Sequence, residues 1–197
     1  MDLKTAILIG PSGCGKGTQA KLLVDYLEKN DSSRKTAYLQ SGEKFREVMQ
    51  GDSYIQKRLK DIVSSGGLSP TFMAIWVWAS MFIEKVEGDE HLIIDGFPRK
   101  ADESPILHTA FEFLGREKPV VISFELEDDV IIKRLVEGRK RADDTEEGVA
   151  KRLKWFRRNV SLAIKFFEEH SYYTVVHVNG DQSPEDVHRD ILDALGL

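Results

Sequence analysis

Gly-Pro-Ser-Gly-Cys-Gly-Lys-Gly-Thr, residues 10–18, follows an apolar run and precedes a segment with the composition of a helix. This order of strand, glycine loop and helix is typical of a phosphate-binding loop. The glycines allow the backbone to come close to a ligand, so several N–H groups can point at an anion together with the positive end of the helix. Lys16 adds a full positive charge for the outer phosphates of a nucleotide. The motif usually has Ser or Thr directly after this lysine, but here Gly17 follows it and the hydroxyl group comes one position later, at Thr18. The stretch therefore predicts a nucleotide-binding fold.

Apolar segments alternate with helical patterns along the rest of the chain. This alternation predicts an α/β fold with a five-stranded parallel sheet covered by helices. The predicted strands are residues 3–9, 36–40, 91–94, 120–126 and 174–178. The predicted helices are residues 16–29, 41–49, 52–64, 101–114, 128–137, 147–169 and 184–195.

A further helix is predicted to start with Ser69 as its cap and Pro70 in its first turn, where the missing N–H has no cost. Aromatic side chains cover most of its circumference, and Phe72, Trp76 and Trp78 are among them. We expect these side chains in the core, because a base-stacking platform is the rarer use of aromatic residues at helical spacing.

Composition and charge exclude several classes of protein. Hydrophobic residues make up 41% of the chain and charged residues 31%, which are values of a globular protein. The net charge of −5 argues against nucleic acid as a partner. Between Lys133 and Arg158, however, ten Lys or Arg stand against five Asp or Glu. Such a patch suits a compact anion, and a nucleotide is the anion that the glycine loop also predicts.

The single cysteine, Cys14, excludes an internal disulfide and a cysteine-based zinc site. The reducing compartment that this composition suits is the cytoplasm, and we expect a cytoplasmic protein without zinc. The uncharged segment 68–83 is shorter than the roughly 20 residues needed to span a bilayer. The apolar run near the N-terminus is shorter than a signal peptide. The sequence thus predicts no contact with a membrane.

Ligands of parallel sheets bind beyond the carboxyl ends of the strands, and several informative residues follow predicted strands. Ser41-Gly42 comes after the second strand and Asp95-Gly-Phe-Pro-Arg99 after the third. A carboxylate at the end of a strand holds the magnesium shell in phosphate-loop enzymes, so we expect Asp95 to bind Mg²⁺, through water. The glycine and proline turn is expected to aim Arg99 back across the same edge.

Taken together, these motifs resemble those of the adenylate kinases, within the nucleoside monophosphate kinases. The resemblance covers almost the whole chain and rests on the glycine loop, on Ser41-Gly-Glu43, on Asp95-Gly-Phe-Pro-Arg99 and on Arg141-Ala-Asp-Asp144 followed by Arg152. It implies a reversible, Mg²⁺-dependent phosphoryl transfer from ATP to AMP that gives two ADP without a covalent enzyme intermediate. The implied partners are these nucleotides, and we expect a monomer.

The resemblance also implies roles for individual residues. The ATP-binding set is Gly13, Cys14, Gly15, Lys16, Gly17, Thr18, Arg134, Arg139 and Gln182. The monophosphate-binding set is Ser41, Gly42, Arg46, Gly67, Leu68, Ser69, Gly96, Phe97, Arg99, Glu103, Arg141 and Arg152. The catalytic set is Lys16, Arg99, Arg139, Arg141 and Arg152. Arginine suits such a site because its rigid fork binds phosphate bidentately and the transition state needs positive charge more than covalent chemistry.

The same resemblance implies a single domain of three parts. The core comprises residues 1–40, 88–138 and 149–197; residues 41–87 are an inserted helical part that binds the monophosphate; and residues 139–148 are a short lid. The lid has no room for an inserted zinc-bearing or β-stranded portion. Its acidic pair, Asp143 and Asp144, is expected to orient the neighbouring arginines through ion pairs.

Two positions depart from the family pattern. Gly67 stands where many relatives carry Lys, and Glu103 stands where adenylate kinases carry the Gln that reads adenine. An ionised carboxylate only accepts hydrogen bonds, whereas adenine offers a donor beside an acceptor. Glu103 is therefore expected either to turn into solvent or to accept one bond. AMP remains the favoured acceptor, CMP, UMP or GMP are alternatives, and a nucleotide-binding regulator without transfer activity is a more distant one.

Overall fold

The structure is a computed structural model of residues 1–197. It describes the whole chain except residues 65–66, 68 and 140–143, and it does not describe the side chain of Arg139. The strands are β1 Thr5–Ile9, β2 Thr36–Gln40, β3 His91–Asp95, β4 Val120–Glu125 and β5 Thr174–Asn179. The helices are α1 Lys16–Asn30, α2 Ser41–Val48, α3 Tyr54–Ser64, α4 Thr71–Lys85, α5 Glu103–Phe113, α6 Asp128–Lys133, the π-helix η1 Arg134–Arg139, α7 Glu146–Glu168 and α8 Pro184–Leu195.

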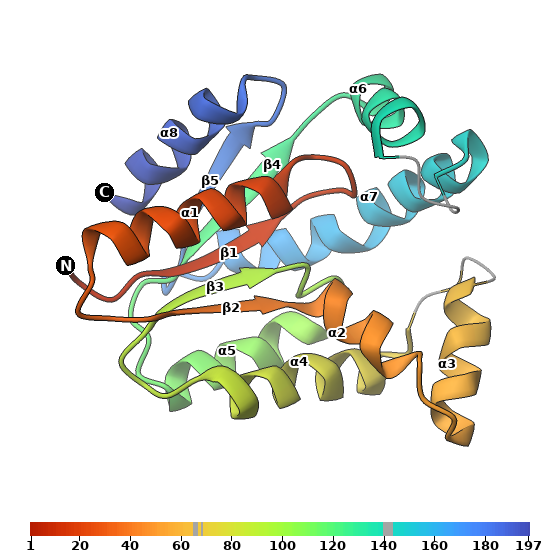
Figure 1. Cartoon of the computed structure of the whole chain (residues 1–197), viewed down its shortest axis with the longest axis horizontal. Helices are drawn as coiled ribbons and strands as arrows, with labels where there is room; N and C mark the ends of the chain where they lie inside the picture. Colours follow the sequence, from red (N-terminus) through yellow and green to blue (C-terminus); the bar gives the residue numbers. More distant parts are fainter. Residues whose placement is uncertain (65–66, 68, 140–143) are drawn as a thin grey trace.

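The five strands form one parallel sheet in the order β2-β3-β1-β4-β5, which confirms the predicted fold class (Figure 1). β1 lies at the centre, with β3 on one side and β4 on the other, and all five of its residues are buried. Such burial on both faces explains why its sequence is a continuous apolar run and does not alternate. Because β1 and β3 are neighbours, the glycine loop after β1 and the turn after β3 leave the sheet side by side.

Helices cover both faces of the sheet, and successive residues of β1 point to opposite faces. Ala6 and Leu8 belong to a buried apolar cluster that also contains residues of α1 and α8. Ile7 and Ile9 belong to a second cluster, formed with residues of α4, α5 and α7. In Figure 1, α1 and α8 accordingly lie above the sheet, and α4 and α5 lie below it. The sheet is therefore the middle layer between two hydrophobic cores.

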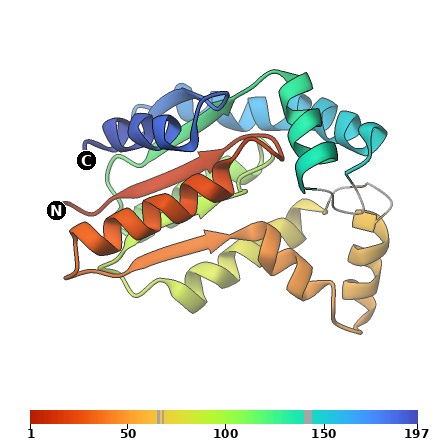
Figure 2. The ribbon, with the colours of Figure 1, turned by 45° about the horizontal axis from the view of Figure 1, so that its top comes forward.

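Helices α2 and α3 project from the same end of the sheet as α6 and η1, as Figures 1 and 2 both show. This is the end at which β1, β2 and β3 finish. Segments that are far apart in the sequence therefore gather around the carboxyl edge, where the sequence predicts the ligand.

Several helices and strands begin or end one or two residues from the predicted bounds. Three larger details also differ from the prediction. Helix α4 begins at Thr71, so Pro70 is its N-cap and does not lie in its first turn. The expected helix 128–137 divides into α6 and the π-helix η1, which continues to Arg139. Trp78 is buried as predicted, but Phe72 and Trp76 are 62% and 52% exposed. The prediction that all three aromatic residues belong to the core is therefore wrong for two of them.

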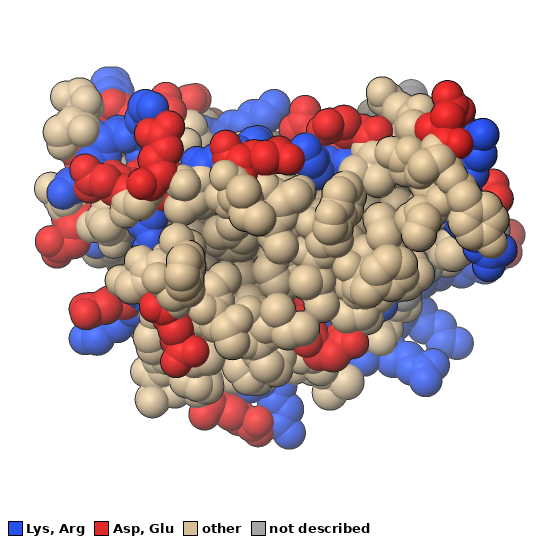
Figure 3. Space-filling view, turned by 90° about the horizontal axis from the view of Figure 1, so that it is seen from below, with Lys and Arg blue, Asp and Glu red and all other residues tan. Residues whose placement is uncertain are grey.

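The underside of the molecule, below α4 and α5, is poor in charge. Figure 3 shows mainly uncharged residues across this face, with Lys, Arg, Asp and Glu gathered toward its margins. Besides Phe72 and Trp76, the exposed apolar side chains of α4 and α5 include Ile83 and Ile106. None of the helices in the described ranges is both long and apolar enough to cross a membrane.

Candidate active site

The glycine loop connects β1 to α1 through backbone conformations that favour glycine. Gly13 and Gly15 have φ angles of 89° and 97°. A Cβ atom on Gly10 would lie 2.7 Å from Cys14 Sγ and 2.9 Å from Phe124 Cβ, so the side chain of any other residue would force the loop away from β4. Gly15 is the N-cap of α1 and supplies no side-chain cap. The loop thus presents the positive end of α1 to an anion, as a phosphate site requires.

Lys16 begins α1 and folds back along the loop. Its Nζ donates a hydrogen bond to the carbonyl oxygen of Pro11 at 3.1 Å and lies 4.0 Å from Cys14 Sγ. The thiol of Cys14 is 2% exposed, and its burial raises the pKa above the usual value, although the charge of Lys16 opposes this shift. Lys16 is therefore positioned over the loop, and Cys14 is a packed thiol inside it.

Asp95 ends β3 directly beside the glycine loop. In the sheet register it is paired with Leu8 of β1 on one side and with Gln40 of β2 on the other. Its Oδ2 accepts hydrogen bonds from Tyr38 Oη at 2.9 Å and from Gln40 Nε2 at 3.1 Å. Oδ2 also lies 3.9 Å from the position that a Cβ of Gly17 would occupy. The carboxylate is therefore held at the start of α1.

The other oxygen of this carboxylate, Oδ1, is buried and has no hydrogen-bond partner within the described part of the chain. A buried carboxylate oxygen without a partner is costly unless a ligand satisfies it. An Mg²⁺ ion with its shell of water would supply that partner, because Mg²⁺ prefers oxygen ligands and retains several waters. Asp95 thus fits the predicted magnesium site. No cluster of three or more His, Cys, Asp or Glu that could hold a metal occurs among the described residues.

The turn after β3 presents Arg99. Gly96 has a φ angle of 87°, and a Cβ on it would lie 2.9 Å from Ser41 Oγ. Ser41 Oγ donates to the carbonyl oxygen of Gly96 at 2.8 Å, and Arg99 Nε donates to the same oxygen at 2.6 Å. Arg99 is exposed, and within the described part of the chain its other guanidinium N–H groups have no hydrogen-bond partner. The start of α2 and the turn after β3 are therefore joined through one carbonyl oxygen.

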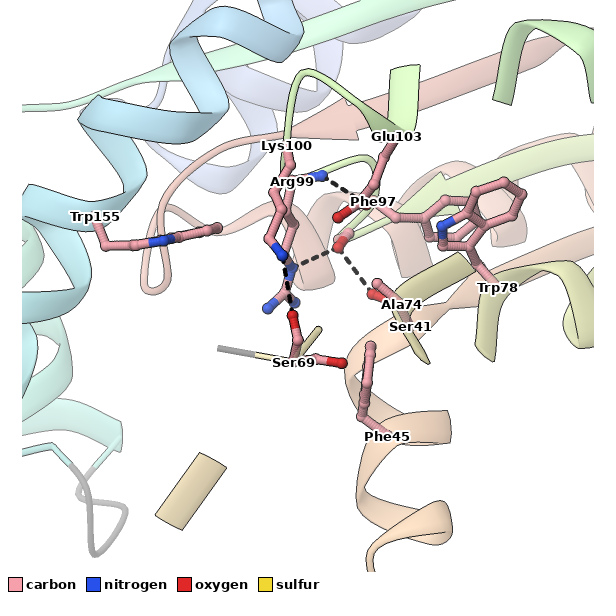
Figure 4. Close-up of a pocket in the computed structure, with 11 residues that line it drawn as sticks. Ser41, Phe45, Ser69, Ala74, Trp78, Phe97, Arg99, Lys100, Glu103 and Trp155 are labelled. Carbon is pink, nitrogen blue, oxygen red and sulfur yellow. Dashed lines mark hydrogen bonds between the residues drawn. The ribbon is translucent and has the colours of Figure 1, made fainter. Parts of the chain in front are cut away.

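A small cavity of about 40 Å³ lies between α2, α4, α5 and α7 (Figure 4). Several side chains predicted to bind the monophosphate line it: Ser41, Ser69, Gly96, Phe97, Arg99 and Glu103. Residues without a predicted ligand-binding role complete the wall: Phe45, Ala74, Trp78, Lys100 and Trp155.

Two of the additional wall residues, Trp78 and Lys100, make contacts with neighbouring segments. Trp78 stacks on Phe97 with ring centroids 5.6 Å apart and planes only 2° from parallel. Lys100 Nζ donates to the carbonyl oxygen of Ser69 at 3.0 Å and to Thr71 Oγ1 at 3.1 Å, so it ties the turn after β3 to the start of α4 (Figure 4). Trp155 reaches the cavity from α7, which is remote in sequence. No local motif marks it, and only the folded chain brings it there.

Glu103 is 2% exposed, so the first of its two predicted alternatives, a side chain turned into solvent, is wrong. Its Oε2 accepts a hydrogen bond from the backbone N–H of Arg99 at 3.1 Å. Burial raises the pKa of the Glu103 carboxyl group above the usual value, while the Arg99 N–H and the charges of Arg99 and Lys100 oppose the shift. A buried acid therefore stands in the wall of the cavity, at the first residue of α5.

Arg152 lies half-buried on α7 and pairs with Asp144, whose side chain is buried, at 2.6 Å between Nη2 and Oδ1. This ion pair confirms the expected partner for one of the two acidic residues. Asp143, the other, lies outside the described residues, as do Leu68 and Arg141. The side chain of Arg139 also lies outside the description.

Arg134 and Gln182 are brought together at the end of β5. Arg134 Nη1 donates to the carbonyl oxygen of Gly180 at 3.0 Å, and its Nη2 lies 3.5 Å from Asp181 Oδ1. Gln182 Nε2 donates to Asp190 Oδ2 at 2.8 Å. The predicted contacts of Arg134 and Gln182 with adenine stay predictions.

The remaining predicted residues lie on the inserted helical part. Arg46 is exposed on α2, and its Nη1 lies 3.6 Å from the position of a Cβ on Gly42. The N–H of Gly67 donates to the carbonyl oxygen of Ile62 at 2.8 Å. A Cβ on Gly67 would lie 2.8 Å from that oxygen, so a larger residue such as Lys would not fit here without movement of the backbone.

Comparison with known proteins supports the motifs. A family model described as adenylate kinase matches residues 8–172. Adenylate kinase 1 of Nostoc sp. is 30% identical over 190 residues, which cover 96% of this chain and 97% of that protein. An adenylate kinase of Corynebacterium diphtheriae is 28% identical, with coverages of 96% and 98%. A uridylate kinase of Saccharomyces cerevisiae is 31% identical over 200 residues, which cover 98% of this chain and 91% of that protein.

Proposed function

The chain belongs to the adenylate kinase family and is a nucleoside monophosphate kinase, and on that premise we propose that it transfers a phosphoryl group from ATP to AMP, with Mg²⁺, to give two ADP. The observation that carries the proposal is the arrangement along the edge of the sheet. The glycine loop with Lys16 follows β1, and the turn with Arg99 follows the neighbouring strand β3. Two phosphate-binding elements on adjacent strands suit two nucleotides whose phosphates meet between them.

The transfer itself requires alignment and positive charge more than covalent chemistry. Lys16 and the N–H groups at the start of α1 would hold the phosphates of ATP, and Arg99 would hold the phosphate of the acceptor. Arg152, oriented by Asp144, would add charge from α7. We extend the catalytic role to Arg139 and Arg141 on the resemblance alone. Charge developing on the transferred group would be stabilised by cations already in place, which is the main source of catalysis in such sites.

Asp95 would hold the Mg²⁺ shell through its buried Oδ1. When bound, the ion neutralises charge on the ATP phosphates. Tyr38 and Gln40 bond to Oδ2, and within the described part of the chain Oδ1 has no hydrogen-bond partner that would compete with the ion. The chain's contribution here is therefore to orient one carboxylate beside the start of α1.

We assign the monophosphate to residues 41–87 together with the turn after β3, and the role of a lid to residues 139–148. The cavity in Figure 4 would be the entrance to the acceptor's base site, with Ser69 and Trp155 on its walls. We also propose that the protein is a cytoplasmic monomer that needs no zinc, since its one cysteine is buried in the glycine loop.

A second acceptor has support of its own. The chain is 31% identical to a uridylate kinase and 30% identical to an adenylate kinase. The resemblance described under Sequence analysis also implies that Glu103 departs from the adenylate kinase pattern. A coupled assay with ATP, Mg²⁺ and each of AMP, UMP, CMP and GMP separates these possibilities. We expect the highest kcat/KM for AMP. The Lys16→Ala variant, purified in the same way, measures any contaminating kinase. A higher kcat/KM for another monophosphate would overturn AMP as the acceptor, and no turnover with any of the four would overturn the enzymatic proposal.

A further inference from the structure

The carboxyl group of Glu103 is buried, and the proposed phosphoryl transfer does not explain its burial. A carboxylate that is 2% exposed needs hydrogen bonds or opposite charge to remain ionised. Within the described chain, the backbone N–H of Arg99 is the donor that this group has, and it bonds to Oε2. The group nevertheless faces the cavity in which the acceptor's base would lie.

The hydrogen bond from the backbone N–H of Arg99 determines which oxygen of a neutral Glu103 would carry the proton. In a neutral carboxylic acid one oxygen accepts hydrogen bonds as a carbonyl, and the other carries the proton. Because Oε2 already accepts the N–H of Arg99, the proton belongs on Oε1. Glu103 would then present an acceptor beside a donor, which is the pattern of a glutamine amide. The backbone of the phosphate-binding turn thus selects the oxygen that would carry the proton.

Adenine matches this neutral pattern and does not match the ionised one. Its amino group donates one hydrogen bond, and the adjacent ring nitrogen accepts one. A neutral acid can satisfy both, whereas a carboxylate would place a lone pair against the ring nitrogen. Guanine differs, because its edge offers two neighbouring N–H donors that a carboxylate can accept together. The protonation of one side chain would therefore decide between two purines.

We propose that Glu103 binds the acceptor base as a neutral carboxylic acid. At pH values at which Glu103 of the free enzyme is ionised, binding of AMP is then coupled to the uptake of one proton from solvent onto Oε1. This inference rests on the proposed function, in which AMP is the acceptor. It makes Glu103 a specificity-determining residue whose preference for adenine over guanine weakens as the pH rises.

The groups around Glu103 fit this coupling. Charges of the turn act on it from nearby: Arg99 and Lys100 favour the ionised form, and Asp102 favours the neutral form. The neighbouring elements contribute uncharged side chains to the cavity: Ser41 and Phe45 from α2, Ala74 and Trp78 from α4, and Trp155 from α7. When the phosphate of AMP binds Arg99, its negative charge offsets the positive charge of that residue. Binding of the acceptor would therefore favour the proton on Glu103 further.

The test is the dissociation constant of AMP, measured by calorimetry from pH 5.5 to 9.5 on the wild type and on Glu103→Gln. The amide of the variant keeps an acceptor for Arg99 N–H and cannot lose a proton. We expect the ratio of the wild-type constant to the variant constant to rise with pH, about 10-fold per pH unit where free Glu103 is ionised. In the same range, AMP binding should take up more protons in the wild type than in the variant. A ratio that stays constant across the range would overturn the proposal.

GMP provides a matched control that needs no variant, because its phosphate ionises like that of AMP. In the wild type the ratio of the AMP constant to the GMP constant should also rise with pH, and an unchanged ratio would contradict the inference. Failure of the two proposals can be told apart. AMP turnover with pH-independent ratios would refute only the proton on Glu103. Proton-coupled AMP binding without AMP turnover would refute only AMP as the acceptor.

Discussion

Tyr38 donates its hydroxyl hydrogen to Oδ2 of Asp95 at 2.9 Å, across the boundary between β2 and β3. Burial and the charge of Asp95 raise the pKa of Tyr38, so the hydroxyl remains a donor throughout the neutral and moderately alkaline range. This bond fixes the carboxylate that we assign to Mg²⁺. The hydrogen bond therefore connects Tyr38, a residue of β2, to the carboxylate at the edge of the sheet to which we assign Mg²⁺.

The Tyr38→Phe variant should therefore bind Mg²⁺ more weakly while keeping its fold. One hydrogen bond to a charged group contributes about 1.5 to 3 kcal/mol, so we expect the Mg²⁺ concentration for half-maximal activity to rise about 10-fold or more. Activity measured against Mg²⁺ at saturating nucleotide would show this. Tyr26→Phe, which alters a tyrosine that contacts His188 on α8, is the matched control. Identical Mg²⁺ dependence in both variants would argue that Asp95 does not hold the ion.

Replacement of Lys16 by Ala should reduce turnover by about three orders of magnitude, by comparison with other cations that act on a transferred phosphoryl group. The fold should persist, since Lys16 makes one side-chain bond to a loop carbonyl, that of Pro11. Steady-state kinetics and circular dichroism would measure the two effects. The control is Lys21→Ala, on an exposed position of α1. A folded Lys16→Ala protein with near-normal turnover would contradict the assignment.

Asp144→Asn should lower kcat/KM by about 10-fold, because Arg152 would lose the charged partner that orients it. The control is Asp128→Asn, which removes an exposed ion pair with Arg157 and should change the free energy of unfolding by less than about 0.5 kcal/mol. Kinetics and urea denaturation on both variants separate loss of function from loss of stability. Equal kcat/KM in the two variants would show that the buried pair does not serve catalysis.

Glu103 should also make stability depend on pH without any nucleotide. Burial raises its pKa, so the folded state binds more protons than the unfolded state above about pH 4.5. The contribution of this group to stability is then present at low pH and is lost as the pH rises through its folded pKa. Urea denaturation should show Glu103→Gln gaining stability over the wild type as the pH increases.

Glu117→Gln, which alters an exposed carboxylate beyond α5, is the control and should show no such trend. A stability difference between Glu103→Gln and the wild type that did not change with pH would contradict the raised pKa.

Cys14 should resist alkylation in the native protein. Burial removes access, and the raised pKa lowers the fraction of reactive thiolate about 10-fold for each pH unit. Mass spectrometry after iodoacetamide treatment reads this site alone, because the chain has no other cysteine. We expect labelling to become fast only after unfolding in urea. Rapid labelling under native conditions would mean that the loop opens.

Local sequence patterns were enough to predict the order of the strands along the chain, the phosphate loop and the residues that end β1 and β3. These features are local. Continuous apolar runs form strands that are buried on both faces of the sheet, and the spaced glycines allow backbone conformations that other residues rarely adopt. The glycine loop, Asp95 and Arg99 could therefore be assigned to the carboxyl edge of a sheet without knowledge of which strands are neighbours in that sheet. The π-helix at Arg134–Arg139 and the start of α4 could not, because such boundaries depend on packing around them.

The surroundings of Glu103 could not be predicted from local patterns. Its burial depends on helices that are distant in sequence, and Trp155 on α7 carries no local signal of its place in the cavity. Whether the Glu103 side chain lies in solvent or in the interior depends on the cost of its desolvation and on the hydrogen bond from Arg99. Both depend on the positions of the neighbouring residues in the folded chain. Likewise, the pairing of β2 with β3 places Tyr38 and Gln40 on one oxygen of Asp95, while the other oxygen has no hydrogen-bond partner among the described residues. Residue types predicted the chemistry of the edge, and long-range packing selected which atoms remain available to a ligand.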